Sequence, residues 1–171
     1  MEYIKKNKLL IKKINSMADY DQKLRHLAVK NNDWKSVKKF DHLHSESLKK
    51  IISRYGWPTI NMVGKKTSKN AWLIVQHADH DRSFQKHCLV IMKRELSKNP
   101  LSISKVNIAY LTDRILISSG KKQLFGTQFK RDSAGIMTLR PITNKKEVNK
   151  RRKEYGMETL EEYVQIALNR K

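Results

Sequence analysis

Residues 71–79 read AWLIVQHAD, an apolar run that passes directly into three polar side chains. An apolar run of this kind belongs inside a fold, so Gln76, His77 and Asp79 are predicted to be at least partly buried. Buried polar groups require hydrogen-bond partners. The segment therefore predicts a buried helix with a candidate site at its carboxyl end.

Helical periodicity continues on both sides of this segment. Residues 5–30 predict one broken helix or two short helices, and residues 35–55 predict a helix that Gly56 ends. A loop is expected through Gly64, after which Thr67 or Ser68 can cap the helix that contains His77. A further helix ends before Pro100, and four residues form its apolar stripe: Phe84, Cys88, Ile91 and Met92.

A helix over residues 102–118 has an apolar face that a carboxylate interrupts. Val106, Tyr110 and Ile117 share this face with Asp113. An unpaired buried carboxylate is costly, so a cationic or hydrogen-bonding partner is expected for Asp113.

The only good strand signal lies in the last third of the chain. Residues 123–129 and 136–142, joined by the turn-rich residues 130–135, predict a β-hairpin. Two pairs with capping-box spacing, Asn144 with Glu147 and Thr159 with Glu162, open two final helices. The predicted fold class is mainly α with a small β-hairpin (α+β). At 171 residues the chain is expected to form a single compact domain, residues 1–171, with residues 1–20 as a peripheral N-terminal helix.

The composition is strongly basic, with a formal net charge of +21. The basic residues are spread along the chain, and lysines account for 27 of the 37. Specific phosphate and base recognition favours arginine, so the charge predicts weak, non-specific association with nucleic acids. No apolar run is long enough for a membrane span and no secretory signal is present, so a soluble cytoplasmic protein without a membrane partner is expected.

A series of short motifs runs in order along most of the chain. These motifs are Asp21-Gln22 with Arg25, Tyr55-Gly56-Trp57-Pro58, Val63-Gly64, Gln76-His77-Ala78-Asp79, Gln85, Asp113-Arg114, Gly120-Lys121-Lys122-Gln123, Gly126-Thr127-Gln128, Pro141, Val148, Arg151-Arg152, Gly156, Leu160 and Tyr163. Together they resemble an uncharacterised bacterial family, the domain-of-unknown-function 6624 family, with a family-like core over residues 21–163. The chain departs from the family pattern at His44, where asparagine is expected, and at Phe125, where tyrosine is expected, so no role that needs a phenol hydroxyl at position 125 is predicted. The resemblance implies a common pocket and supplies no reaction.

The favoured hypothesis is an enzyme that modifies a small molecule or a peptide, with His77 and Asp113 as catalytic residues that approach each other or share a polar neighbour. The alternatives are a non-catalytic binding or interaction protein, in which the same polar cluster is structural, and a non-specific nucleic-acid binder. Neither His77 with His80 nor His42 with His44 makes a convincing ligand set, so no metal site is predicted. The sequence specifies no cofactor and no oligomeric state. The predicted substrate-binding residues are Gln76, Asp79, Arg114, Gln123, Gln128 and Arg152.

Overall fold

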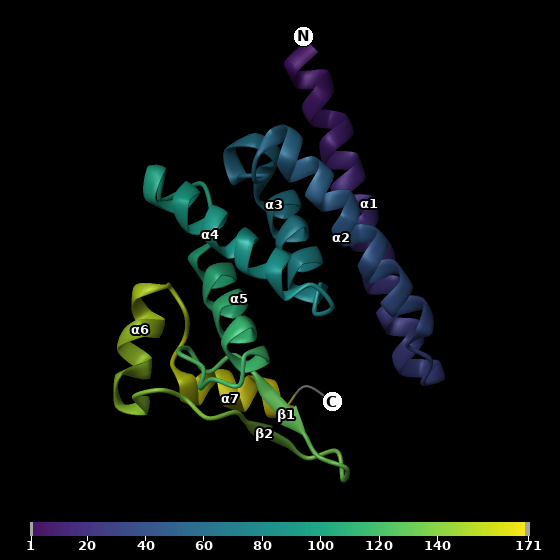
Figure 1. The fold of residues 1–171 in the computed structure, drawn as a ribbon. Coiled ribbons are helices and arrows are strands. Elements are labelled where there is room, and N and C mark those ends of the chain that lie inside the picture. The colour runs from purple at the N-terminus through teal and green to yellow at the C-terminus, as the bar shows by residue number, and fades with distance from the viewer. Residues whose placement is uncertain (1, 170–171) are drawn as a thin grey trace. The chain divides into compact units, whose positions relative to one another are not determined.

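The computed structural model describes the backbone of residues 2–169 and the side chains of residues 7–169. The fold is mainly helical with one two-stranded antiparallel sheet, as the sequence predicts (Figure 1). The chain divides into two compact units, Met1–Ser104 (unit 1) and Lys105–Lys171 (unit 2). Each unit has its own candidate polar cluster.

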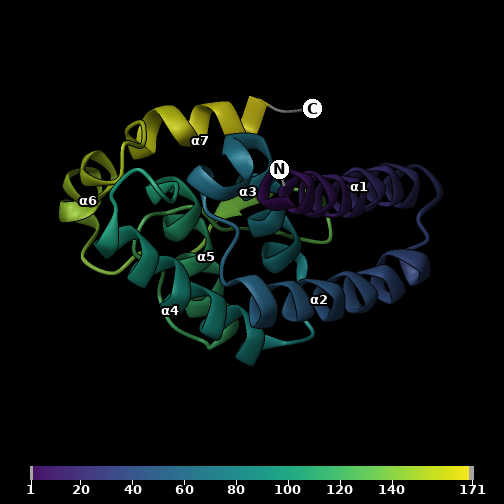
Figure 2. The ribbon, with the colours of Figure 1, turned by 90° about the horizontal axis from the view of Figure 1, so that it is seen from above.

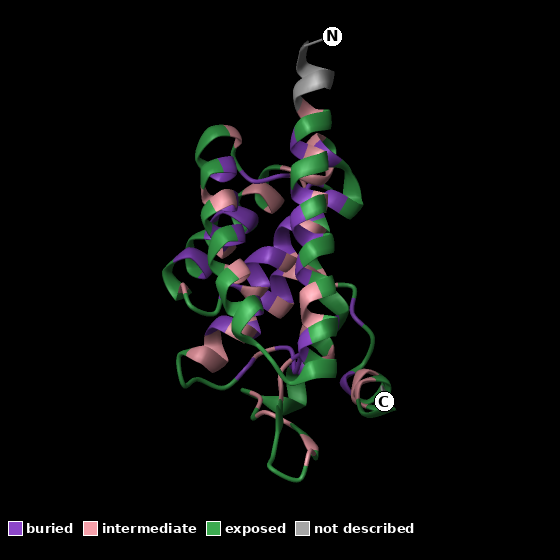
Figure 3. Ribbon diagram, turned by 90° about the vertical axis from the view of Figure 1, so that its right-hand side faces the viewer, coloured by how far each residue is buried: buried purple, intermediate pink, exposed green. Residues whose placement is uncertain are grey.

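Unit 1 is built from four helices. Helices α1 (Glu2–Asn31) and α2 (Lys35–Tyr55) lie side by side and antiparallel, joined by a short turn in which Asn32 has a left-handed φ of 51° (Figure 2). Helix α3 (Ile60–His77) packs against both of them and against α4 (Arg82–Lys98). The buried faces of these helices turn toward one another (Figure 3).

Helix α1 is continuous, so the predicted break within residues 5–30 is wrong. The segment contains no glycine or proline, and its buried residues recur at spacings of three and four along one face. That face supports the helix over its whole length because burial of an amphipathic stripe stabilises helices more than local propensity does. The residues on it are Leu10, Ile14, Met17, Ala18, Asp21 and Ala28.

The other helices of unit 1 agree closely with the periodicity of the sequence. Helix α2 covers the predicted range and ends at Gly56, whose φ of 75° suits glycine. The predicted stripe of α4 is buried, and Asp81 caps that helix by accepting a hydrogen bond from the Phe84 amide at 2.9 Å. The predicted loop before α3 is mostly a helical turn from Ile60, interrupted at Gly64. The capping role of Thr67 or Ser68 is therefore wrong, and both residues are buried inside the helix.

Unit 2 contains α5 (Lys105–Ser118), β1 (Phe129–Arg131), β2 (Met137–Leu139), a short 3-10 helix η1 (Lys145–Glu147), α6 (Val148–Glu154) and α7 (Leu160–Asn169). The strands pair with Phe129 opposite Leu139 and Arg131 opposite Met137. The hairpin is thus confirmed but shorter than predicted. A small apolar core of unit 2 contains Ala109, Phe125 and Met157, with Tyr110 and Tyr155 packed against it.

The two predicted capping boxes have opposite outcomes. Thr159 and Glu162 bond reciprocally, with the Thr159 amide 2.8 Å from the Glu162 carboxylate and the Glu162 amide 3.3 Å from the Thr159 hydroxyl. Asn144 has a left-handed φ of 44° and its side chain caps nothing, so the first box is wrong. A left-handed residue does not present its side chain to the following helical turn as an extended N-cap residue does.

Candidate functional site

The candidate site of unit 1 is centred on His77, the last residue of α3. The apolar run before it is buried, which fixes the imidazole at the helix end, where its side chain remains 16% exposed. His77 Nδ1 lies 2.9 Å from Asp21 Oδ2 and 2.9 Å from Arg25 Nε. Asp21 and Arg25 are one turn apart on α1, so a single helix face supplies both partners.

Helix α2 completes the cluster with Asp41 and His44. Arg25 Nη2 donates to Asp41 Oδ1, while Arg25 Nε lies 3.0 Å from Asp21 Oδ1. Asp41 and His44 are three residues apart and therefore face the same way from α2. The His44 ring packs against Phe40, with ring centroids 5.8 Å apart. Three helices thus contribute charged or titratable groups to one partly buried network, which we call the His77 cluster: Asp21, Arg25, Asp41, His44 and His77.

The two carboxylates of the His77 cluster have shifted pKa values of opposite direction. Burial alone would raise the pKa of Asp21, but the hydrogen bond and charge of His77, with Gln22 and Arg25, lower it overall. Burial raises the pKa of Asp41 despite the attraction of Arg25. Asp21 is therefore the carboxylate that stays ionised over the wider pH range, and it is the one bonded to His77.

The two contacts at His77 Nδ1 require different tautomers. If Nδ1 carries the proton, it donates to Asp21, and Nε2 is left with its lone pair. If Nδ1 is unprotonated, it can accept only from Arg25 Nε. The Arg25 Nε–H already has a carboxylate acceptor in Asp21, and a charged acceptor is the stronger one. The first arrangement satisfies both donors, so we assign the Nδ1–H tautomer. No described residue forms a hydrogen bond to Nε2.

Acidification is expected to destabilise unit 1 through its histidines. Burial lowers the pKa of His44; the charge of Arg25 lowers it further, and the charges of Asp21 and Asp41 oppose the shift. The pKa of His80 is also lowered, by burial and by the charge of His42. A base whose pKa is lowered in the folded state contributes stability above its ordinary value of 6.5 and loses that stability as the pH falls below it. The contribution of these two histidines to the free energy of unfolding should therefore decrease from pH 7 to pH 5.

A His44→Asn variant tests this dependence. It removes one titrating ring, so its decrease in unfolding free energy from pH 7 to pH 5, followed by urea denaturation, should be smaller than that of the wild type. Substitution of the exposed His26 serves as the control and should leave the slope unchanged. An identical slope in His44→Asn and wild type would contradict the assignment.

The polar cluster of unit 2 is centred on Asp113, which is fully buried on α5. Its carboxylate accepts hydrogen bonds from the backbone amides of Leu124, Phe125 and Thr127 at 2.7 to 3.1 Å, and from the Thr127 hydroxyl at 3.0 Å. The expected hydrogen-bonding partner of Asp113 is therefore confirmed, and it is a loop backbone. This carboxylate shapes the loop 123–128, which is why the first predicted strand begins only at Phe129.

Two glutamines hold the ends of the same loop. Gln123 is fully buried, donates to the backbone carbonyls of Gln128 and Arg140, and accepts from the Gln128 amide at 2.8 Å. The Gln128 side chain donates to the Thr127 hydroxyl at 3.0 Å. The Gln123 amide thus imitates a backbone strand partner and closes the base of the hairpin.

Arginines of α6 satisfy the carbonyl groups of the loop. Arg152 is fully buried and donates to the carbonyls of Phe125 and Glu158, each at 2.6 Å. Its guanidinium lies 4.9 Å from the centre of the Tyr163 ring. Arg151 donates to the Leu124 carbonyl at 2.9 Å. Asp113, Gln123, Gln128 and Arg152, all predicted site residues, therefore converge on loop 123–128.

The remaining predicted residues lie at the carboxyl end of α3 and on α5. Gln76 is buried, and its Oε1 atom has no hydrogen-bond partner among residues 7–169. Asp79 is exposed and accepts from Gln85 Nε2 at 3.2 Å. Arg114 is half-buried on α5. The partners described for His77 belong to unit 1 and those for Asp113 to unit 2, so their common site remains a prediction.

Four members of the His77 cluster were absent from the predicted site: Asp21, Arg25, Asp41 and His44. Asp21 and Arg25 belong to the residue pattern of the family resemblance, and their i,i+4 spacing places opposite charges on one helix face. That signal was available in the sequence. The pairing of α1 with α2, which adds Asp41 and His44, was not.

The structure was searched for metal-binding groups and for membrane-spanning helices. Among residues 7–169, no group of three or more His, Cys, Asp or Glu side chains is arranged to hold a metal ion. The imidazole rings of His42 and His80 lie close together, with centroids 3.7 Å apart and planes tilted by 33°. Within the part of the chain that the structure describes, no helix has the length and apolar character needed to cross a bilayer.

Comparison with known proteins identifies the family of the chain but assigns no activity. No curated protein and no solved structure matches the chain significantly. One family model, described as a family of unknown function (DUF6624), matches residues 10–170. This match spans both units and includes every residue of the His77 cluster and of loop 123–128, and the chain therefore belongs to the DUF6624 family.

Proposed function

We propose that the protein is an enzyme that acts on a small molecule or a peptide by acid–base catalysis at His77. One contact supports this proposal: the 2.9 Å hydrogen bond between His77 Nδ1 and Asp21 Oδ2. Asp21 is 4% exposed and His77 is 16% exposed, so a buried carboxylate holds a ring that solvent can still reach. A carboxylate on Nδ1–H fixes the orientation and tautomer of the imidazole and leaves Nε2 to accept or donate a proton.

Arg25 fits the role of an anion-binding group beside this base. Its Nε atom donates to Asp21 and its Nη2 atom donates to Asp41, whereas its Nη1 atom enters no hydrogen bond among the described residues. The side chain is 22% exposed. A guanidinium held by two carboxylates is rigid, and its unused edge can donate to a carboxylate or phosphate of the substrate.

We propose a different role for the polar residues of loop 123–128. Asp113, assigned to catalysis on the sequence, accepts hydrogen bonds from backbone amides with both carboxylate oxygens. The Gln123 amide group and the Nε and Nη1 atoms of Arg152 donate to backbone carbonyls. Groups committed in this way shape the backbone. The scaffold alternative from the sequence therefore suits unit 2, and the catalytic hypothesis suits unit 1.

The experiment is a hydrolysis screen with chromogenic esters, phosphates, glycosides and aminoacyl anilides. For any substrate turned over, His77→Ala should lower kcat/KM by about 10²- to 10⁴-fold, the usual contribution of a general acid or base. Asp21→Asn should also lower kcat/KM, because an amide can accept from or donate to Nδ1 and therefore supports either tautomer of the imidazole. The exposed His26, on the same helix as Asp21, provides the control His26→Ala, which should retain activity.

Thermal unfolding of the same variants separates catalysis from scaffolding. Loss of a structural network member typically costs about 1 to 3 kcal/mol, whereas a catalytic histidine can be removed with little loss of stability. A His77→Ala variant that keeps its melting temperature and loses activity supports the enzyme. If activity survives in His77→Ala, or if this variant is strongly destabilised and no substrate is turned over, the proposal fails.

A further inference from the structure

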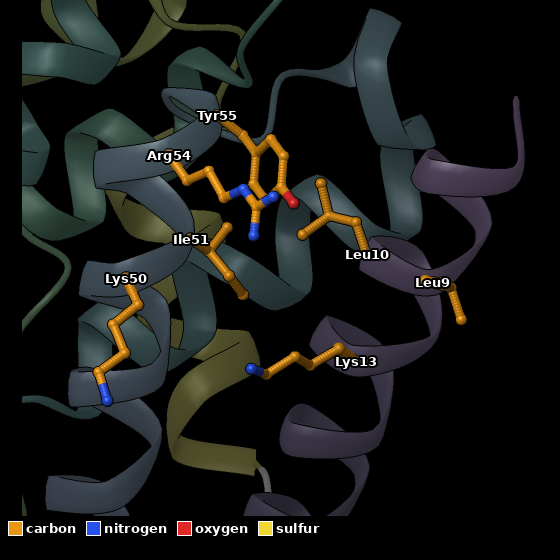
Figure 4. A pocket seen from close by; sticks show the side chains of 7 residues that line it. All are labelled: Leu9, Leu10, Lys13, Lys50, Ile51, Arg54 and Tyr55. Atoms are coloured by element: carbon orange, nitrogen blue, oxygen red, sulfur yellow. The ribbon is translucent and has the colours of Figure 1, made fainter. Parts of the chain in front are cut away.

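A pocket of about 250 Å³ lies between α1 and α2, at the end of the helix pair where α1 begins and α2 ends (Figure 4). Leu10 and Lys13 line it from α1, and Ile51, Arg54 and Tyr55 line it from α2. None of these residues belongs to the His77 cluster, so the pocket is a separate feature of unit 1.

The wall of the pocket is apolar. Leu10 is 7% exposed and Ile51 is 4% exposed, and the half-buried Tyr55 ring lies opposite Leu10 (Figure 4). These side chains form a surface on which a few methylene groups can be removed from water. Leu9, which is 68% exposed, extends the apolar surface at the rim.

The rim is cationic. Lys13 reaches from α1 toward α2, and the Arg54 guanidinium lies beside the Tyr55 ring, 5.3 Å from its centre (Figure 4). Lys50 is the third cation, and among the side chains that the structure describes, none that lines the pocket is acidic. Among the side chains of residues 7–169, none of these three cations forms an ion pair with a carboxylate.

We propose that this pocket binds a small amphipathic anion, a carboxylate or phosphate carried on an alkyl chain. The negative group would pair with Lys13 and Arg54, and the first carbons of the chain would contact Leu10, Ile51 and Tyr55. A volume of about 250 Å³ lies just below the usual range for small-molecule sites, roughly 300 to 1,000 Å³, so only part of a long chain is enclosed.

The geometry disfavours a nucleotide in the same place. Recognition of a base in a single strand uses an open aromatic face for stacking. Arg54 already lies over the Tyr55 ring, which is the aromatic side chain of the described pocket lining. The charges of the rim are therefore better matched to an anion whose remaining part is aliphatic.

Titration calorimetry with decanoate tests the proposal, at concentrations below micelle formation and with decanol as the uncharged analogue. Decanoate should bind saturably at one site, and decanol more weakly. Shortening the acid should weaken binding up to about fourfold for each methylene group that the pocket encloses. Lys13→Gln and Arg54→Gln should each weaken decanoate binding by about two- to fivefold, the range expected of exposed ion pairs.

Lys12→Gln is the matched control, because Lys12 is an exposed lysine on α1 outside the pocket, and it should bind decanoate as the wild type does. Vesicles containing phosphatidylglycerol identify the source of the anion. If the wild type binds decanoate, the anion is a free amphiphile. If the wild type binds vesicles but not decanoate, and Lys13→Gln and Arg54→Gln lose vesicle binding, the anion is a lipid headgroup.

Three results would overturn the proposal. The first is decanol binding as tight as decanoate binding. The second is binding of decanoate and vesicles by Lys13→Gln and Arg54→Gln at the affinity of the wild type and of Lys12→Gln. The third concerns nucleic acid. A single-stranded oligonucleotide whose affinity falls in Lys13→Gln and Arg54→Gln, with no binding of decanoate or vesicles, would show that these cations belong to a nucleic-acid surface.

Discussion

Replacement of Asp113 by alanine is expected to lower the free energy of unfolding of unit 2 by about 3 to 5 kcal/mol. The carboxylate is fully buried and accepts hydrogen bonds from three backbone amides and one hydroxyl. Its removal leaves the amides of Leu124, Phe125 and Thr127 without acceptors in a buried place, and each such donor carries a desolvation penalty.

Hydrogen exchange of these three amides shows whether they lose protection in Asp113→Ala. Urea denaturation measures the loss in the free energy of unfolding. Asp132→Ala is the control, because Asp132 is an exposed carboxylate of unit 2 that accepts a single backbone hydrogen bond, from Ile136. Its substitution should cost about 1 kcal/mol or less. A loss as small as this in Asp113→Ala, with protected amides in loop 123–128, would contradict the scaffold role.

Replacement of Arg152 by alanine is expected to cost about 3 kcal/mol or more. The side chain is fully buried, and its loss removes the donors to the carbonyls of Phe125 and Glu158 and the packing against Tyr163. Arg152→Lys should recover only part of the stability because a single ammonium group cannot reproduce the planar set of donors.

Urea denaturation checks the Arg152 prediction, with the exposed Lys153 of the same helix as the control position. Lys153→Ala should unfold within about 0.5 kcal/mol of the wild type. If Arg152→Lys is as stable as the wild type, the fixed geometry of the guanidinium does not hold the loop, and the charge alone suffices.

The helices of unit 1 were predictable because their apolar spacing is regular. The stripe from Phe84 to Met92 and the end of α2 at Gly56 follow from the 3.6-residue period and from glycine's tolerance of positive φ. Helix α1 was harder to predict because lysines interrupt its apolar positions. Its length depends on packing against α2 and α3, which periodicity within one segment does not contain.

The polar residues were easier to find than to interpret. The sequence marks Asp113 as a carboxylate on an apolar face, and its need for partners is confirmed. The identity of those partners depends on the path of loop 123–128, where Gly126 has a φ of 74° and the strand pattern of residues 123–129 suggests extended pairing instead. Local strand propensity is overridden there by hydrogen bonds to a distant side chain.

The partners of His77 illustrate the same limit. The histidine itself follows from its position after a buried run, but Asp21 precedes it by 56 residues and Asp41 lies on a third helix. Only the packing of α1, α2 and α3 brings these residues together. A family pattern that contains Asp21, Arg25 and His77 was the one available signal that they act as a group.

In the proposed enzyme, Asp21 holds His77 with its Nδ1 protonated and its Nε2 available as a base. Nitrogen-15 chemical shifts of the imidazole ring, measured near pH 8 and assigned with a His77→Gln variant, report the tautomer directly. We predict an Nδ1–H ring in the wild type, and a mixture of tautomers in Asp21→Asn. A wild-type ring protonated on Nε2, with Nδ1 accepting from Arg25, would contradict the claim.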